Sequence, residues 1–253
     1  MAGNSIRVAQ FSDLHLSGAP GTTCKGIDTW AQLEKMLLDL GTQGSTDALV
    51  LTGDIAHDEK RETYEQLREI LEERRFPYWV IPGNHDSPQL IREVFWDRVD
   101  PNAASACFCV SLKGYGLIGL DTHEPGSDGG VLGDATRDWF QKRLAELSKT
   151  PVIVFMHHPP LDTGDAFFDS IGLDNREEWF QRIKGYPQIQ AIGYGHLHRA
   201  MTLCENPRVQ GAPSTAFGMV KLDAGLTPVK EQAGYLIWTL NETEFSVEVL
   251  ADL

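Results

Sequence analysis

Residues 78–86 read Tyr-Trp-Val-Ile-Pro-Gly-Asn-His-Asp. The first four, Tyr78 to Ile81, form a short apolar run of aromatic and β-branched residues, which predicts a buried β-strand. Proline and glycine end this run, and Asn84, His85 and Asp86 follow at once. In an open α/β sheet, the loops at the carboxyl ends of the strands converge where ligands bind. The stretch therefore predicts a strand that ends in a cluster of polar side chains with a functional role.

Four other strand-like runs end in histidine or aspartate in the same way. They are residues 6–11 before Asp13-Leu14-His15, 48–52 before Gly53-Asp54, 152–156 before His157-His158, and 189–194 before Gly195-His196-Leu197-His198. A single His-x-His or Gly-Asp pair is usually structural or solvated. Five such clusters after five strand ends indicate one shared site.

The residue types in these clusters are typical of metal ligands. Carboxylate and amide oxygens mixed with imidazole nitrogens, without thiolate, suit Mn²⁺, Fe or Zn²⁺. The candidates are Asp13, His15, Asp54, Asn84, His157, His196 and His198. They are too many for one ion, but they suffice for two if one carboxylate bridges the ions.

The spacing of the candidates also predicts their orientation. Alternate residues of an extended chain share a face, so Asp13 and His15 are expected to point to one side, and so are His196 and His198. Glycine precedes Asp54, Asn84 and His196, and is expected to let the chain turn tightly at each place.

Helical periodicity fills the segments between these strands. Apolar residues at 33, 36, 37 and 40 follow a capping candidate, Asp28, and precede Gly41, which predicts a helix. Similar stripes occupy residues 64–71 and 140–147, and residues 175–184 form a fourth candidate. The alternation of strand and helix predicts an α/β sheet layered with helices.

The pattern changes after Tyr194. Strand-like segments at residues 208–211, 216–220, 234–240 and 244–250 follow one another without helices. They predict a second, mainly antiparallel sheet packed on the first, with a hairpin turn at residues 241–243. No linker or repeat interrupts residues 1–253, so a single domain is expected.

Composition limits the range of partners. The chain has a formal net charge of −14, which opposes non-specific binding to a nucleic acid polymer. No apolar run approaches the roughly 18 residues needed to span a membrane. The N-terminus lacks the layout of a secretory signal, and the four cysteines lack a CxxC pair, so we expect a cytoplasmic protein with free thiols.

The ordered motifs D-x-H, GD, GNHD, H and GH-x-H resemble those of the calcineurin-like metallophosphoesterase superfamily. The resemblance runs from Asp13 to His198. It implies a four-layer αββα sandwich of two mixed sheets flanked by helices. It also implies a metal-dependent hydrolase with two metal ions.

The resemblance assigns roles residue by residue. One ion would be held by Asp13, His15 and His198, the other by Asn84, His157 and His196, with Asp54 as the bridge. His85 resembles the catalytic histidine that stabilises the phosphoryl group or protonates the leaving oxygen. Asn84, His85 and His196 are also expected to contact substrate, with His123 and His158 as further candidates, whereas His57 is expected to face solvent.

Within the superfamily, Gly83-Asn84-His85-Asp86 and His157-His158-Pro159-Pro160-Leu161 resemble the class III cyclic nucleotide phosphodiesterases. The implied reaction is hydrolysis of cyclic AMP or a related 3′,5′-cyclic nucleotide, with a purine pocket between the loop after Leu120 and residues 161–173. Glycerophosphodiesterases share these motifs, so a small glycerol diester, or a broad range of small diesters, is the alternative substrate. A non-catalytic scaffold would be expected to lack a ligand or His85, and a homodimer is compatible with the sequence.

Overall fold

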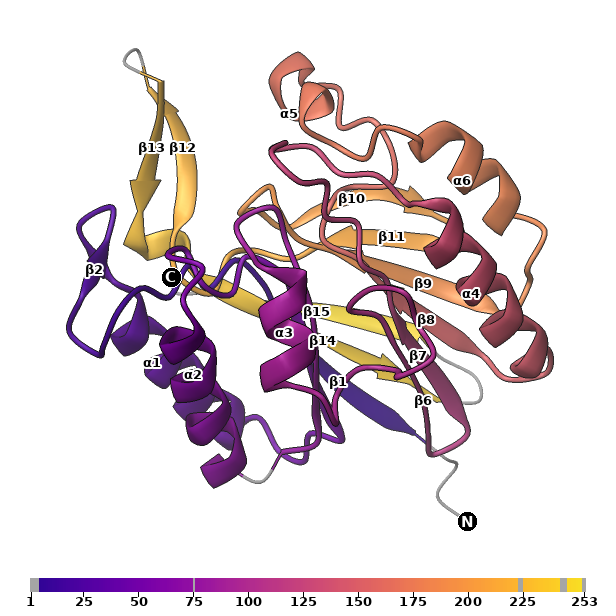
Figure 1. Ribbon diagram of the computed structural model, residues 1–253, viewed down its shortest axis with the longest axis horizontal. Helices are drawn as coiled ribbons and strands as arrows, with labels where there is room; N and C mark the ends of the chain where they lie inside the picture. The colour runs from indigo at the N-terminus through magenta and orange to yellow at the C-terminus, as the bar shows by residue number, and fades with distance from the viewer. Residues whose placement is uncertain (1–4, 75, 223–224, 242–244, 252–253) are drawn as a thin grey trace.

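The computed structural model describes residues 5–74, 76–222, 225–241 and 245–251. In that part of the chain, two sheets pack face to face at the centre (Figure 1). The first contains β1 (Ile6–Phe11), β4 (Ala48–Thr52), β5 (Tyr78–Ile81), β14 (Gly234–Leu240) and β15 (Phe245–Ala251), in the order β15-β14-β1-β4-β5. The second contains β6 (Phe108–Leu112), β7 (Tyr115–Gly119), β8 (Val152–Phe155), β9 (Ile189–Tyr194), β10 (Met201–Glu205) and β11 (Arg208–Gly211), in the order β10-β11-β9-β8-β7-β6.

Helices cover the outer faces of both sheets (Figure 1). The helices α1 (Thr29–Thr42), α2 (Arg61–Arg74) and α3 (Pro88–Val94) lie on the side of the first sheet, and α4 (Asp134–Glu146), α5 (Ala166–Ser170) and α6 (Arg176–Ile183) lie on the side of the second. Two hairpins, β2 (Thr23–Cys24) with β3 (Ile27–Asp28) and β12 (Gly218–Leu222) with β13 (Gly225–Val229), lie outside both sheets, and a 3-10 turn, η1 (Lys230–Gln232), precedes β14.

Three apolar cores separate the layers. Val8, Val50 and Phe155 belong to the core between the two sheets. Alternate residues of the same strands, such as Ala9 and Leu49, pack with α1 and α2 instead. A third core, from Val154 and its neighbours, packs against α4 and α6. The implied αββα sandwich of two mixed sheets is confirmed.

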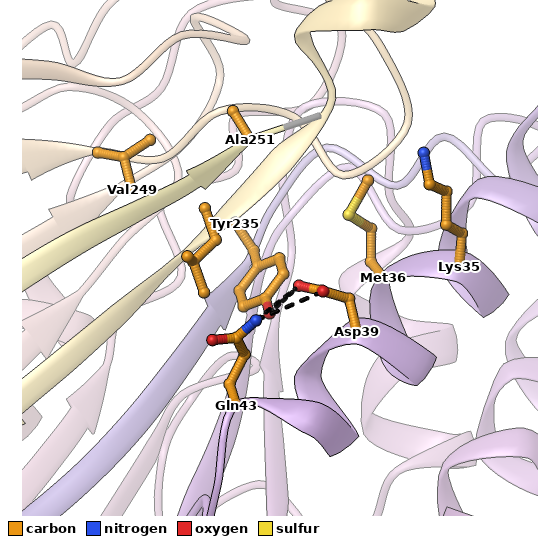
Figure 2. A pocket seen from close by; sticks show the side chains of 8 residues that line it. Lys35, Met36, Asp39, Gln43, Tyr235, Val249 and Ala251 are labelled. Atoms are coloured by element: carbon orange, nitrogen blue, oxygen red, sulfur yellow. Dashed lines mark hydrogen bonds between the residues drawn. The ribbon is translucent and has the colours of Figure 1, made fainter. Parts of the chain in front are cut away.

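The first predicted helix shows how local sequence sets these elements. The Asp28 side chain accepts a hydrogen bond from the Ala31 N–H, as expected of a cap, and the predicted apolar stripe is buried. The helix ends at Thr42, one residue beyond Gly41. At the far side of α1, the Tyr235 hydroxyl of β14 donates to Asp39 at 2.7 Å. Figure 2 shows this contact in a pocket that contains no histidine.

The prediction of a second, mainly antiparallel sheet from the C-terminal strands is wrong. β11 pairs in parallel with β9, so it extends the second sheet. β14 pairs antiparallel with β1 and carries β15 with it into the first sheet. The hairpin pairing of β14 with β15 is confirmed, while residues 242–244 of its turn lie outside the described residues. The alternation of apolar residues indicates which face of a strand is buried, but it does not indicate which strand lies beside it.

Gln10 of β1 forms a buried polar link between the sheets. Its Nε2 donates to Thr52 Oγ1 of β4 at 3.0 Å and to the Tyr194 carbonyl of β9 at 3.1 Å. Its Oε1 accepts from the Trp238 indole of β14 at 2.9 Å. This one side chain therefore ties three strands of the first sheet to the second sheet, directly below the strand ends.

No helix of the described residues is long and apolar enough to cross a membrane.

Replacing Gln10 with methionine should keep the side-chain length while removing these three hydrogen bonds. We expect the free energy of unfolding to fall by roughly 2–3 kcal/mol, because the buried Trp238 N–H loses its acceptor. Urea unfolding measures the change. Gln190→Met, at an exposed position of β9, is the matched control and should change stability by less than about 0.5 kcal/mol. Equal stability of the two variants would contradict the role of Gln10.

Candidate metal centre

The structure brings all seven candidate ligands to one place. They lie in the loops after β1, β4 and β5 of the first sheet and after β8 and β9 of the second. Each loop begins at the carboxyl end of its strand, as the sequence predicts. Asp13, His157 and His198 are buried, and so are Asp54 and His15. The two sheets thus converge on a common group of oxygen and nitrogen atoms.

The first half of this group contains Asp13, His15 and His198. The Nε2 atoms of His15 and His198 lie 3.0 Å apart. His198 Nε2 lies 3.5 Å from Asp13 Oδ1. His15 Nε2 lies 3.6 Å from Asp54 Oδ2. Four side chains therefore direct one donor atom each toward a shared point.

The second half contains Asn84, His157 and His196. Asn84 Oδ1 lies 3.0 Å from His196 Nδ1 and 3.1 Å from His157 Nε2. The two ring nitrogens are 3.3 Å apart. His157 Nε2 lies 3.4 Å from Asp54 Oδ1. Asp54 therefore presents one carboxylate oxygen to each half, which is the arrangement that a bridging ligand requires.

These separations fit two metal ions. Ligand atoms about 2.1 Å from one ion and at right angles to each other lie roughly 3 Å apart. The supporting hydrogen bonds also fit, because His157 Nδ1 donates to the Thr52 carbonyl at 2.8 Å and His198 Nδ1 donates to the Phe217 carbonyl at 2.8 Å. Each of these bonds leaves the opposite ring nitrogen unprotonated and directed into the group.

Burial keeps the histidines in the form that binds metal. It lowers the pKa of His196 to about 3 and that of His198 to about 4, so both rings are neutral at pH 7. Burial, together with the nearby Asp54 carboxylate, raises the pKa of Asp13 well above its usual value. Two buried carboxylates so close together need positive charge, and divalent cations supply it.

The expectation of extended backbone at the ligand pairs is wrong. Asp13, His15, His196 and His198 all have positive φ, at 53°, 45°, 70° and 53°. Asp54 has φ of 50°. Left-handed backbone costs a non-glycine residue roughly 1–2 kcal/mol, and such strain persists where the surroundings enforce it. The paired side chains therefore do not meet through the alternation of an extended strand.

Gly53 and Gly83 allow the loops to meet. A Cβ on Gly53, whose φ is +89°, would lie 2.5 Å from His157 Nδ1 and 2.7 Å from the Gly83 nitrogen. A Cβ on Gly83 would lie 2.2 Å from Asp54 Oδ1. Gly53 therefore both turns the chain and permits close approach, whereas Gly83 is needed for close approach alone.

Asp86 joins two of the loops, a role that the sequence analysis did not assign. Its buried carboxylate accepts from the backbone N–H groups of Ile55, Ala56 and Gly83 at 2.8–3.1 Å. It also accepts from the Tyr64 hydroxyl at 3.0 Å. The fourth residue of Gly83-Asn84-His85-Asp86 thus fixes the Asp54 loop against the Asn84 loop.

The remaining histidines also lie at this site. His123 lines a cleft of about 440 Å³ together with Asn84 and His85, as expected. His158 is fully buried, and its ring nitrogens contact Thr122 Oγ1 at 2.8 Å and the Asp128 carbonyl at 3.3 Å. His57, which was expected to face solvent, is partly exposed, and its ring lies 4.9 Å from that of His85.

Phe217 and Lys25 are two further neighbours that the sequence analysis did not identify. The Phe217 ring stacks on His15, with centroids 5.3 Å apart and an interplanar angle of 17°. Lys25 Nζ lies 5.9 Å from the Phe217 ring centroid. The buried side chain of Cys24 packs with Phe217, which fixes the β2–β3 turn beside the site. Lys25 therefore places a positive charge near the candidate metal centre, in a protein that is acidic as a whole.

The family model of the calcineurin-like phosphoesterases matches residues 6–200. The chain belongs to this family. Enzymes of the calcineurin-like phosphoesterase family use two metal ions, in agreement with the two halves of the site. The chain is accordingly a metal-dependent phosphoesterase, and the resemblance seen in its motifs is confirmed.

Individual relatives agree with this membership. A Synechococcus protein named "Probable cyclic nucleotide phosphodiesterase" is 33% identical over 225 residues, which cover 87% of this chain and 86% of the relative. A glycerophosphodiester phosphodiesterase of Enterobacter lignolyticus is 28% identical, over 82% of this chain and 77% of its own. A dimetal phosphatase from Danio rerio shares the fold, with a TM-score of 0.70 and 11% identity over 98% of this chain and 96% of its own.

Asp54→Ala should release metal and abolish phosphodiesterase activity. The substitution removes the oxygen that faces each half of the site and leaves two cations to repel each other. Metal content per chain, measured by elemental analysis after gel filtration, reports the loss directly. Asp138→Ala, at an exposed position of α4, is the control and should keep its metal and activity. An active Asp54→Ala protein with a full metal content would exclude the bridge.

Lys25→Gln should raise the KM for an anionic diester roughly two- to fivefold, the effect of removing one exposed positive charge, with kcat little changed. The dependence of kcat/KM on salt should also become shallower. Lys142→Gln, on the exposed surface of α4, alters the net charge equally and should leave KM unchanged. If both variants behave alike, Lys25 acts only through the net charge of the protein.

Proposed function

We propose that this phosphoesterase hydrolyses a 3′,5′-cyclic nucleotide, cyclic AMP in particular, to the 5′-nucleotide. The observation that carries the proposal is the position of Asp54, with one carboxylate oxygen facing each half of a histidine-rich site and the His85 ring beside them. The sequence similarity to a protein named as a cyclic nucleotide phosphodiesterase supports this choice of substrate.

The seven side chains Asp13, His15, Asp54, Asn84, His157, His196 and His198 would hold the two ions. When bound, these ions activate water and polarise the phosphoryl oxygens of the substrate. We favour Mn²⁺ or Fe as the bound metal, with Zn²⁺ as a further candidate, because all three accept mixed oxygen and imidazole ligands.

His85 is the proposed catalytic histidine. Its backbone N–H donates to Asp54 Oδ1 at 2.9 Å, which fixes the start of the side chain relative to the ligands. Its ring lies 5.3 Å from that of His15 and lines the open cleft. In the reaction, the oxygen of one water would bond to phosphorus and that water would give up a proton. The bond from phosphorus to O3′ would break, and His85 would deliver a proton to O3′. Asn84 and His196 would contact the phosphoryl group beside it.

The cleft next to His85 is the proposed site of the nucleoside. It lies between the loop after β7 and the first turn of α3, with the lining residues Glu59, Asn84, His85, Asp86, Ser87, Pro88, His123, Pro125, Gly126, Ser127 and Asp128. The expected border at the loop after Leu120 is present, whereas residues 161–173 do not line this cleft. The carboxylates of Glu59 and Asp128 can accept hydrogen bonds from ribose hydroxyl and adenine amino groups.

A glycerophosphodiester is the second candidate substrate. The lining residues of the cleft include no Phe, Tyr or Trp on which a purine ring could stack, and its carboxylates suit a small polar or cationic alcohol. The similarity to the Enterobacter lignolyticus enzyme supports this alternative. The metals, His85 and the reaction at phosphorus would be the same for both substrates.

Four free cysteines support a reducing compartment, and we propose a cytoplasmic enzyme. The net charge of −14 and the acidic cleft oppose a nucleic acid polymer as substrate. A homodimer stays a proposal that a measurement of molecular mass in solution would test.

The experiment that tests the function uses chelator-treated protein reconstituted with Mn²⁺, Fe²⁺ or Zn²⁺. Cyclic AMP, glycerophosphocholine and bis-p-nitrophenyl phosphate are supplied separately, and the products are identified by chromatography. Metal-dependent formation of 5′-AMP at the highest kcat/KM supports the proposal. Turnover of glycerophosphocholine without cyclic AMP turnover would establish the second candidate, and no turnover of any diester would overturn both.

His85→Ala should keep both metals while slowing hydrolysis by roughly two to four orders of magnitude, the usual contribution of a positioned proton donor. The His85 side chain is not among the seven proposed ligands, and its backbone N–H, which contacts Asp54, is kept in the variant, so elemental analysis should show unchanged metal content. Loss of metal together with activity would instead place His85 among the ligands.

A further inference from the structure

His57 stands out among the polar groups of the molecule that the proposed reaction leaves unused. Its half-buried ring lies 4.9 Å from His85 and 5.5 Å from His15, centroid to centroid. One nitrogen from each of His15, His57 and His85 falls within 4.8 Å of the others. His57 is therefore the side chain in ring contact with both a candidate ligand and the proposed catalytic histidine.

The backbone of His57 is fixed firmly. The loops after β1 and β4 run side by side, joined by hydrogen bonds from His15 N to the Asp54 carbonyl, from Leu16 N to the Ile55 carbonyl, and from His57 N to the Leu16 carbonyl, all at 2.8–2.9 Å. Asp86 holds the same loop against the loop that carries His85. The rings of His57 and His85 thus project from two loops whose separation is set by a buried carboxylate.

A purely structural histidine would normally satisfy its buried ring nitrogen within the protein. The buried Nδ1 of His57 has no hydrogen-bond partner among the described residues. By contrast, the fully buried His158 contacts hydrogen-bond partners at both ring nitrogens. The placement of His57 is therefore explained by its ring contacts and not by a hydrogen bond that holds the fold.

We infer that His57 is a positioning residue for His85, holding that ring in the orientation that delivers a proton to the leaving oxygen. Rings with centroids 4.5–7 Å apart are in packing contact. Among the described residues, none forms a hydrogen bond with the ring of the half-buried His85 that would fix its orientation. The neighbouring ring of His15 borders it on one side, and His57 borders it on another. Without His57, the His85 ring gains rotational freedom where its direction decides proton transfer.

This inference rests on the proposed role of His85, and leaving-group chemistry provides its test. An alkoxide needs a proton as its bond to phosphorus breaks, whereas p-nitrophenolate leaves without one. His57→Ala should therefore lower kcat about tenfold or more on cyclic AMP, and less than about threefold on bis-p-nitrophenyl phosphate. If cyclic AMP is not a substrate, glycerophosphocholine replaces it as the alkoxide diester, so failure of the nucleotide proposal does not affect this test.

Three further variants separate positioning from other roles. His57→Phe keeps a ring against His85 and should recover most of the lost kcat. His57→Ala should have no further effect in a His85→Ala background, because it acts through His85. Lys60→Ala, an exposed change in the same loop, should match the wild type.

Metal content and thermal midpoint are measured for every variant. Equal losses on both classes of diester, additive losses in the double variant, or release of metal from His57→Ala would overturn the inference. A His57→Ala enzyme as fast as the wild type on the alkoxide diester would overturn it as well.

Discussion

Gly53, Gly83 and the His157 ring meet so closely that no Cβ fits between them. The two glycines follow neighbouring strands of the first sheet, and His157 follows a strand of the second. Their contact therefore sets the distance between the sheets at the end where the candidate ligands lie. Asp54 presents an oxygen to each half of the site only because its loop can approach both Asn84 and His157 this closely.

The ligand loops hold an unfavourable backbone geometry that the surrounding structure sustains. Five candidate ligands have left-handed φ, and none of them is glycine. Their backbone is held by cross-loop hydrogen bonds such as Asp13 N to the Gly53 carbonyl at 3.0 Å, and by the buried carboxylate of Asp86. The Gln10 network below them joins the two sheets. Stability in the core thus offsets strain at the site, which keeps the donor atoms in place before metal binds.

The electrostatics of the site differ from those of the whole chain. A net charge of −14 would repel a phosphodiester anion at long range. At the site, burial lowers the pKa values of His196 and His198, so these rings are neutral at pH 7, and the carboxylates face inward toward the expected cations. Lys25 is held beside the centre by the packing of Cys24 against Phe217. The net negative charge and the acidic cleft are consistent with the proposed preference for small diesters over polyanions.

The sequence by itself determined the five strands that precede the candidate ligands, the helices α1, α2, α4 and α6, the seven candidate ligands and the family. Those features are local, since an apolar run that ends in Gly-Asn-His-Asp or Gly-His-x-His is read within a few residues. The helix cap at Asp28 could be predicted for the same reason, because it depends only on residues next to it in the sequence. No short stretch of sequence decides between a cyclic nucleotide and a glycerophosphodiester as substrate. The preference for a cyclic nucleotide stays a proposal.

Only the tertiary structure decided which strands are neighbours, which conformation the ligand pairs adopt and what surrounds them. β14 and β11 joined different sheets because burial of a strand face is encoded in its own alternation, whereas its partner is chosen by packing across the whole chain. His57, Lys25 and Phe217 are separated by long stretches of sequence and carry no motif, yet folding brings all three to the centre. Contacts between residues so far apart in the sequence arise only when the chain folds, so no local pattern could have revealed them.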